Sequence, residues 1–314
     1  MTEPGFAEVY AAAERIRGLV HRTPVVTCRT LNRITGCEVL LKCENLQKVG
    51  AFKARGASNA VCCLDEQTAA RGVCSHSSGN HAQALAWAAA VRGIPAHIVM
   101  PRTAPAVKRA AVLGYGARVT DCEPTLAARE AALAQVREAT GAEPVHPYDD
   151  PRVIAGQGTA ALELLEQAPG LEAILVPVGG GGLASGCCLA AAGAAPGLEV
   201  WGAEPAGADD AFRSLRDGVR HPSEGPRTIA DGLLTALSER TFRILGAHLA
   251  GILTVSEPAI VAAMRLLMER VKLVVEPSGA VPLAVLLEHA ERFHGRRVGL
   301  VLSGGNVDLE RLPW

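Results

Sequence analysis

The fold is decided by residues 174–186, which read ILVPVGGGGLASG. A short apolar run, four glycines and a run of small residues follow one another, as in a buried strand, a tight loop and a helix. The uncharged stretch around them, residues 173–198, is long enough to cross a bilayer. Because Pro177, Pro196 and the glycines interrupt it, we interpret it as strand, loop and helix inside a globular core.

Similar apolar runs recur along the chain between longer stretches with helical periodicity. This alternation is typical of βαβ units, in which helices cover a parallel sheet, so the predicted class is α/β. The predicted strands are 39–42, 96–100, 174–178, 198–201 and 298–302. The predicted helices include 80–92, 104–113, 125–138, 156–167 and 258–271.

The composition excludes several classes of protein. The chain has 314 residues, 49% of them hydrophobic, which fills a sizeable core and excludes intrinsic disorder. A net charge of −1 leaves no cationic surplus for phosphates, so neither a nucleic-acid nor a membrane partner is expected. Nine cysteines without C-x-x-C spacing, and an N-terminus without a signal pattern, favour a reduced protein of the cytoplasm.

The four glycines offer a site for an anion. Free backbone N–H groups and a helix dipole at residues 179–182 favour a phosphate. The spacing Gly179-x-Gly181-x-x-Ala184 also fits a relaxed dinucleotide fingerprint, with Glu199 or Glu204 as the ribose-binding acid. No Gly-Lys-Ser/Thr follows, which excludes a Walker loop, and a plain strand-to-helix turn is a third interpretation.

A second polar segment, residues 74–81, reads CSHSSGNH and leads into the predicted helix 80–92. Hydroxyl, amide and imidazole groups at a helix N-terminus can hold a carboxylate or a phenolate oxygen. Ser and Asn also favour N-caps on their own account, but four such groups within six positions favour a binding loop.

Two further residues complete the pattern. Lys53 lies beside Phe52 among small residues, where partial burial would lower its pKa toward the nucleophilic amine, although a solvated lysine is the alternative. Ser303 follows the predicted strand 298–302, at the sheet edge where α/β proteins bind ligands. A reactive lysine, a polar loop, a phosphate cradle and a strand-end serine together indicate a pyridoxal phosphate site rather than a nicotinamide site.

On these residues the sequence resembles the fold-type II pyridoxal-phosphate enzymes, specifically the serine racemase and threonine/serine dehydratase family. The matching segments are KVGAFKARGA (48–57), SSGNH (77–81), VIAGQGT (153–159), PVGGGG (177–182) and SGGNVDL (303–309). The resemblance implies a tryptophan synthase β-like fold with two open, twisted, parallel-rich sheets flanked by helices. It also implies a large cofactor-binding domain from residues 1–70 and 145–314, and a small mobile domain from residues 71–144.

The resemblance also implies roles for single residues. Lys53 would bind the cofactor as a Schiff base and move the Cα proton, and Ser78 would be the acid and base on the opposite face in the racemases. The implied cofactor-binding residues are Phe52, Lys53, Asn80, Gly179, Gly180, Gly181, Gly182 and Ser303. The implied substrate-binding residues are Ser77, Ser78, His81, Arg129 and Thr235.

A cation site is implied as well. Glu204, Ala208 and Asp210 match the family's site for a divalent cation, and their oxygens suit Mg²⁺, Ca²⁺ or Mn²⁺. Two positions depart from the racemase pattern. Thr235 replaces a common serine, and Tyr148 replaces an asparagine that helps to bind ATP, which argues against nucleotide regulation.

We therefore predict a cytoplasmic homodimer that acts on a small amino-acid substrate. The predicted reaction is β-elimination from L-serine or L-threonine-type 3-hydroxy amino acids to 2-oxo acid and ammonia, with racemisation of serine as an accompanying reaction. Serine racemase as the main activity and 3-hydroxyaspartate dehydratase are the alternatives. Arg129 makes the acidic substrate worth testing, although a solvated helix arginine is the other interpretation of this residue. A nicotinamide oxidoreductase and a non-catalytic amino-acid sensor match the motifs less well.

Overall fold

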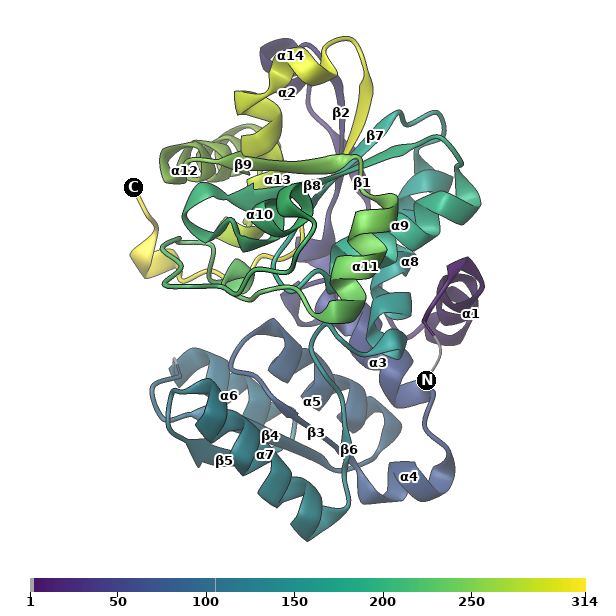
Figure 1. Cartoon of the computed structure of the whole chain (residues 1–314), viewed down its shortest axis with the longest axis vertical. Helices are drawn as coiled ribbons and strands as arrows, with labels where there is room; N and C mark the ends of the chain where they lie inside the picture. The colour runs from purple at the N-terminus through teal and green to yellow at the C-terminus, as the bar shows by residue number, and fades with distance from the viewer. Residues whose placement is uncertain (1–2, 105) are drawn as a thin grey trace.

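The computed structural model describes residues 3–104 and 106–314. Residue 105, inside the predicted helix 104–113, and residues 1–2 lie outside the described residues. Among the described residues the strands form one sheet of six, in the order β1-β2-β10-β7-β8-β9, and one of four, in the order β5-β4-β3-β6. The larger sheet occupies the upper half of Figure 1 and the smaller sheet the lower half.

The strands are β1 (Val25–Thr27), β2 (Glu38–Lys42), β3 (Val73–His76), β4 (Ala96–Pro101), β5 (Arg118–Cys122), β6 (Glu143–Pro144), β7 (Ala173–Pro177), β8 (Glu199–Pro205), β9 (Gly251–Val255) and β10 (Arg297–Val301). The α-helices are α1 (Phe6–Ile16), α2 (Arg29–Thr35), α3 (Lys53–Cys62), α4 (Glu66–Arg71), α5 (Asn80–Arg92), α6 (Ala106–Gly114), α7 (Leu126–Thr140), α8 (Pro151–Gln167), α9 (Gly182–Ala194), α10 (Asp210–Asp217), α11 (Glu239–His248), α12 (Glu257–Leu266), α13 (Pro277–Glu288) and α14 (Ala290–Phe293). The short helices are η1 (Glu44–Leu46), η2 (Lys48–Gly50), η3 (Ala206–Ala208), η4 (Asp231–Leu233), η5 (Leu267–Val271) and η6 (Leu309–Arg311).

The predicted α/β class is confirmed, and the predicted strands and helices are present with shifted ends. Strands β1, β3, β5, β6 and β9 are not among the five predicted strands. β1 and β6 are too short to show a pattern, and β5 is mostly exposed, so it lacks the apolar run that marks a buried strand. None of the described helices is long and apolar enough to cross a membrane. The domain boundaries, the mobility of the small domain and the homodimer remain predictions.

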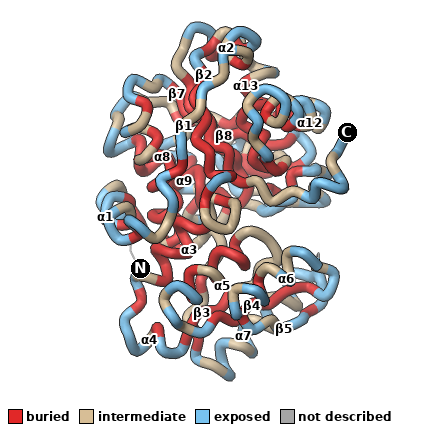
Figure 2. The backbone as a smooth tube through the Cα atoms, turned by 180° about the vertical axis from the view of Figure 1, so that it is seen from behind, coloured by how far each residue is buried: buried red, intermediate tan, exposed pale blue. Residues whose placement is uncertain are grey.

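Three hydrophobic clusters fill the molecule. One lies on the α12 and α13 side of the larger sheet, a second on its α8 and α9 side, and a third joins α3 and α5 to the smaller sheet. Figure 2 shows buried backbone running through the strands of the larger sheet and through α3, whereas α7 is largely exposed or intermediate. Helix α3 therefore lies where the two halves of the molecule meet.

Helix α3 is held by ion pairs that are shielded from water. Arg55 is completely buried, and its Nε and Nη1 donate to Glu44 at 2.7 Å and to Glu163 at 2.8 Å. Lys42 Nζ donates to the same Glu163 at 2.6 Å. Burial would raise the pKa of Glu44, but Arg55 outweighs it and holds that pKa below its usual range. Removing one partner would leave a buried charge without a counter-charge, which is energetically costly. The network therefore fixes the position of α3 and of Lys53, the first residue of this helix.

The parallel strands of the larger sheet bring distant segments to one edge. β2, β10, β7 and β8 run in the same direction, so their carboxyl ends lie side by side. The segments that follow these ends lead to Lys53, to Ser303, to residues 179–182 and to residues 206–210. This is the edge at which open α/β sheets commonly bind ligands.

Candidate active site

Lys53 lies among groups from several segments. Its Nζ donates a hydrogen bond to the backbone oxygen of Pro147 at 2.7 Å and lies 5.1 Å from the centre of the Phe52 ring. Burial lowers the pKa of Lys53 to about 8, against the opposing attraction of the Glu276 carboxylate. The pKa of Lys53 is therefore lowered in the direction expected from its small neighbours, and part of the lysine is a neutral amine near neutral pH.

The glycine loop, residues 179–182, connects the end of β7 to the start of α9. In the described part of the chain none of its backbone N–H groups donates a hydrogen bond within the protein. Gly181 has a φ of 83°, which favours glycine. Tyr148 covers the loop, because a Cβ on Gly180 would lie 2.4 Å from its ring. Tyr148 follows Pro147, the partner of Lys53, so the lysine and a cradle suited to phosphate are close together.

The two acids considered for a dinucleotide are engaged elsewhere. Glu199 begins β8 and pairs with Ala173 at the start of β7, at the opposite end of the strand from the glycine loop. The carboxylate of Glu204 accepts the backbone N–H groups of Ala211 and Phe212 at 3.0 and 2.8 Å. The dinucleotide interpretation therefore has no free acid to bind a ribose.

Ser303 lies next to the start of α3. The backbone N–H of Phe52 donates to the backbone oxygen of Ser303 at 2.9 Å, and Ala51 pairs with Gly304 in an antiparallel bridge. Ser303 itself is buried. These contacts bring a hydroxyl group from the C-terminal end of the chain to the residues that precede Lys53.

The predicted binding loop at residues 77–81 connects β3 to α5. Ser77 and Ser78 are partly exposed, and the backbone N–H of Ser77 donates to the oxygen of Val99 at 3.2 Å. His81 is buried, its Nε2 lies 3.1 Å from the oxygen of Val145, and its Nδ1 has no partner among the described residues. Burial lowers the pKa of His81 to about 3, so this imidazole is neutral at physiological pH.

Two residues without a predicted role, Glu276 and His146, also lie here. Glu276 accepts hydrogen bonds from Asn80 and from the backbone N–H of Asn306. The rings of His146 and Tyr148 pack edge to face, with their centres 4.6 Å apart. Burial lowers the pKa of His146 to about 4. One local signal was available for Glu276, since it precedes Pro277 at the start of the apolar helix α13. Its partners are distant in sequence and left no local signal.

The two remaining substrate residues have different surroundings. Arg129, on α7, is half-buried, and its Nε has no partner among the described residues. Burial lowers the pKa of His76 at the end of β3; the negative charge of Glu130 opposes this shift and the positive charge of Arg129 adds to it. Thr235 is exposed and lies beside the glycine loop, because its Oγ1 would be 3.4 Å from a Cβ on Gly179.

The predicted cation ligands lie at the carboxyl end of β8. Glu204, Ala208 and Asp210 are buried, and Oδ2 of Asp210 has no partner within the described residues. Burial raises the pKa of Glu204 to about 8 and also raises the pKa of Asp210. Within the described ranges no group of three or more His, Cys, Asp or Glu could hold a metal. A site here would combine two carboxylates with a backbone oxygen, which suits a hard cation.

Comparisons with known proteins agree with this geometry. Residues 16–304 match the family described as pyridoxal-phosphate dependent enzyme. The chain belongs to this family. It is 50% identical over 311 residues to a beta-hydroxyaspartate dehydratase of Paracoccus denitrificans (strain Pd 1222), covering 99% of each protein. It is 48% identical over 309 residues to a serine racemase of Dictyostelium discoideum, covering 97% of this chain and 95% of that protein.

A solved structure supports the same assignment. The crystal structure of a threonine deaminase of T.th. has a TM-score of 0.93 and 48% sequence identity, covering 98% of this chain and 99% of that one. The predicted fold-type II architecture is therefore confirmed. The chain is a pyridoxal-phosphate dependent enzyme of the group that contains serine racemases and ammonia-lyases.

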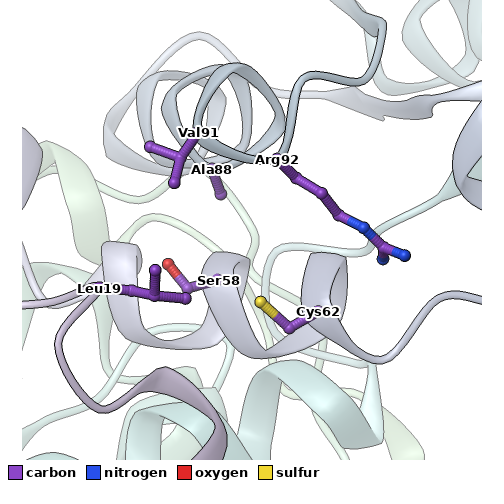
Figure 3. A pocket seen from close by; sticks show the side chains of 6 residues that line it. All are labelled: Leu19, Ser58, Cys62, Ala88, Val91 and Arg92. Atoms are coloured by element: carbon purple, nitrogen blue, oxygen red, sulfur yellow. The ribbon is translucent and has the colours of Figure 1, made fainter.

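A separate cavity lies between α3 and α5 (Figure 3). It is lined by Leu19, Ser58, Cys62, Ala88, Val91 and Arg92. The guanidinium of Arg92 donates to the backbone oxygens of Val61 and Leu64 and pairs with Glu66. Because that cation is already engaged and most of the remaining wall is apolar, we assign this cavity no part in the chemistry of the site.

We predict that Gly180→Ala lowers the free energy of unfolding by about 1–3 kcal/mol, because the added methyl overlaps the Tyr148 ring. In a Tyr148→Ala background the same change is expected to cost less than about 1 kcal/mol. Urea unfolding of four cofactor-free proteins measures these costs: the unaltered protein, the two single variants and the double variant. Equal costs in both backgrounds would show that Tyr148 does not cover the glycine loop.

Proposed function

We propose that this enzyme eliminates water from 3-hydroxy amino acids. Hydrolysis of the dehydrated product then consumes one water and releases ammonia, so the net products are a 2-oxo acid and ammonia. The observation that carries the proposal is Lys53, a lysine whose pKa is lowered to about 8 by burial, next to a glycine loop with free N–H groups. A partly neutral amine beside an anion cradle is what a cofactor with an aldehyde and a phosphate requires.

The residues present fit pyridoxal phosphate. When bound, the cofactor supplies an electron sink that stabilises negative charge at the substrate Cα. The groups that would hold it are the Lys53 amine, the N–H groups of Gly179, Gly180, Gly181 and Gly182, the Asn80 amide, the Phe52 ring and Ser303. A serine hydroxyl, unlike a carboxylate, does not enforce a protonated pyridine nitrogen, so the sink is mild.

Two groups of the chain would move protons. The Nζ of Lys53 exchanges a proton near neutral pH because burial lowers its pKa, so it is the base for the substrate Cα. Ser78, partly exposed in the loop before α5, is the proposed proton donor on the opposite face. Ser77 and the neutral His81 offer hydrogen bonds to the substrate carboxylate.

Among possible substrates, 3-hydroxyaspartate is supported best. Arg129 is a half-buried cation whose Nε is unpartnered among the described residues, and a second carboxylate would satisfy it. The relative at 50% identity is a beta-hydroxyaspartate dehydratase. Racemisation of serine is the second candidate, supported by Ser78 and by the Dictyostelium discoideum relative, which is a serine racemase.

The proposed function is tested by product analysis of the enzyme supplied with pyridoxal phosphate and a divalent cation. We expect 2-oxo acid and ammonia from 3-hydroxyaspartate with a kcat/KM at least about tenfold above that for L-serine. Lys53→Ala is expected to abolish turnover of both. Turnover by Lys53→Ala would contradict the proposal, and D-serine as the main product from L-serine would favour racemisation.

Replacement of Arg129 tests the substrate class. Arg129→Gln is expected to raise KM for 3-hydroxyaspartate about tenfold or more, since a charge-assisted hydrogen bond is lost, while KM for L-serine changes little. Arg137→Gln, an exposed position on the same helix, is the control and is expected to match the unaltered enzyme. An equal effect of Arg129→Gln on both substrates would show that Arg129 does not bind the side-chain carboxylate of 3-hydroxyaspartate.

A divalent cation held by Glu204, Asp210 and the Ala208 oxygen is part of this proposal. Adding Mg²⁺, Ca²⁺ or Mn²⁺ to chelator-treated enzyme is expected to raise its Tm, because the cation binds only the folded chain. Asp210→Asn is expected to remove the increase. Asp217→Asn, at the far end of α10, is expected to keep it. A Tm that is the same with chelator and with cation would contradict the site.

A further inference from the structure

Glu276 is a buried carboxylate to which neither the sequence nor the proposed reaction assigns a role. It precedes α13 and is 5% exposed. Its two oxygens accept from Asn80 Nδ2 at 2.9 and 3.2 Å, and one of them also accepts from the backbone N–H of Asn306 at 3.2 Å. The carboxylate therefore joins the first residue of α5 to the segment after β10.

The hydrogen bonds permit a single orientation of the Asn80 amide. Asn306 Nδ2 donates to Asn80 Oδ1 at 2.9 Å, while Asn80 Nδ2 faces Glu276. A flipped amide would place Oδ1 against a carboxylate and bring two NH₂ groups together, losing both interactions. Asn306 is itself fixed, because its Nδ2 also donates to the backbone oxygen of Val49 at 2.8 Å.

Glu276 also lies close to the residues around Lys53. A Cβ on Gly304 would lie 2.5 Å from its Oε1, and Gly304 follows Ser303 and pairs with Ala51. Its negative charge raises the pKa of Lys53 against the effect of burial. This carboxylate is thus the opposing charge for the lysine.

Other charges face Glu276 from elements packed around it. Asp231 on η4 raises the pKa of Glu276 and Lys108 on α6 lowers it, but burial is the main cause and brings this pKa to about 7. Lys108 and Asp231 pair with each other at 2.7 Å. Asp231 and Lys108 thus act on Glu276 in opposite directions, and Glu276 in turn raises the pKa of Lys53.

We propose that Glu276 is a positioning residue of the active site: it holds Asn80 with an amide N–H available to the cofactor, and it supplies the negative charge that faces Lys53. The part that concerns the cofactor rests on the proposed function. The part that concerns Lys53 is a property of the cofactor-free protein and can be measured separately.

The test compares Glu276→Gln with Glu288→Gln, the same change at the exposed end of the same helix. In cofactor-free protein, the rate at which trinitrobenzenesulfonate labels Lys53 is followed against pH by peptide mass spectrometry. Removing the charge is expected to lower the pH midpoint of labelling by about one unit. The dissociation constant for pyridoxal phosphate is expected to rise about tenfold, while Glu288→Gln matches the unaltered protein.

Asn306→Ala separates the two roles. It removes the partner of Asn80 Oδ1 and keeps the carboxylate, so it is expected to weaken pyridoxal phosphate binding and to leave the Lys53 midpoint unchanged. An unchanged midpoint in folded Glu276→Gln would overturn the electrostatic role. Unchanged affinity in Asn306→Ala would overturn the positioning of Asn80.

The outcomes also distinguish this inference from the proposed function. If the unaltered protein bound no pyridoxal phosphate, the proposed function would fail, yet the labelling midpoint would still decide the electrostatic role of Glu276. If it bound pyridoxal phosphate through Lys53 and Glu276→Gln behaved identically, the inference alone would fail.

Discussion

The ion pairs of Arg55 with Glu44 and Glu163 are the interaction on which the rest of the site depends. They lie where α3 meets both halves of the molecule, and Arg55 and Glu44 are completely shielded from water. A buried charge that loses its partner is costly, so the network tolerates little displacement of α3. Lys53 lies two residues before Arg55, and its position relative to both sheets follows from that restraint.

The site is assembled from two sheets rather than built on one. The larger sheet contributes the glycine loop and Ser303 at the carboxyl ends of adjacent parallel strands. The smaller sheet contributes the loop that begins α5. Hydrogen bonds from Asn80 to Glu276 and from Asn306 to Asn80, together with the ion pair between Lys108 and Asp231, join the two contributions. A relative displacement of the sheets would therefore disturb cofactor-binding and substrate-binding groups together.

Burial shifts most of the titratable groups of the site toward their neutral forms. The pKa values of Lys53, His81 and His146 are lowered and that of Glu276 is raised, in each case with burial as the largest cause. Lys53 and Glu276 are left with pKa values near neutrality, at about 8 and about 7. Groups with pKa values near neutrality gain or lose a proton at little cost, which suits the proton transfers of the proposed reaction.

The sequence by itself determined the α/β class, the strand and glycine loop at 173–182 and the helix at 80–92, because these depend on local periodicity, glycine content and capping. It also drew attention to Lys53, through small neighbours that predict burial. Only the tertiary structure decided that Glu276 and Asn80, 196 residues apart, share hydrogen bonds, and that Tyr148 covers the glycine loop. Such contacts arise from strand order and helix packing, which short-range patterns along the chain do not encode.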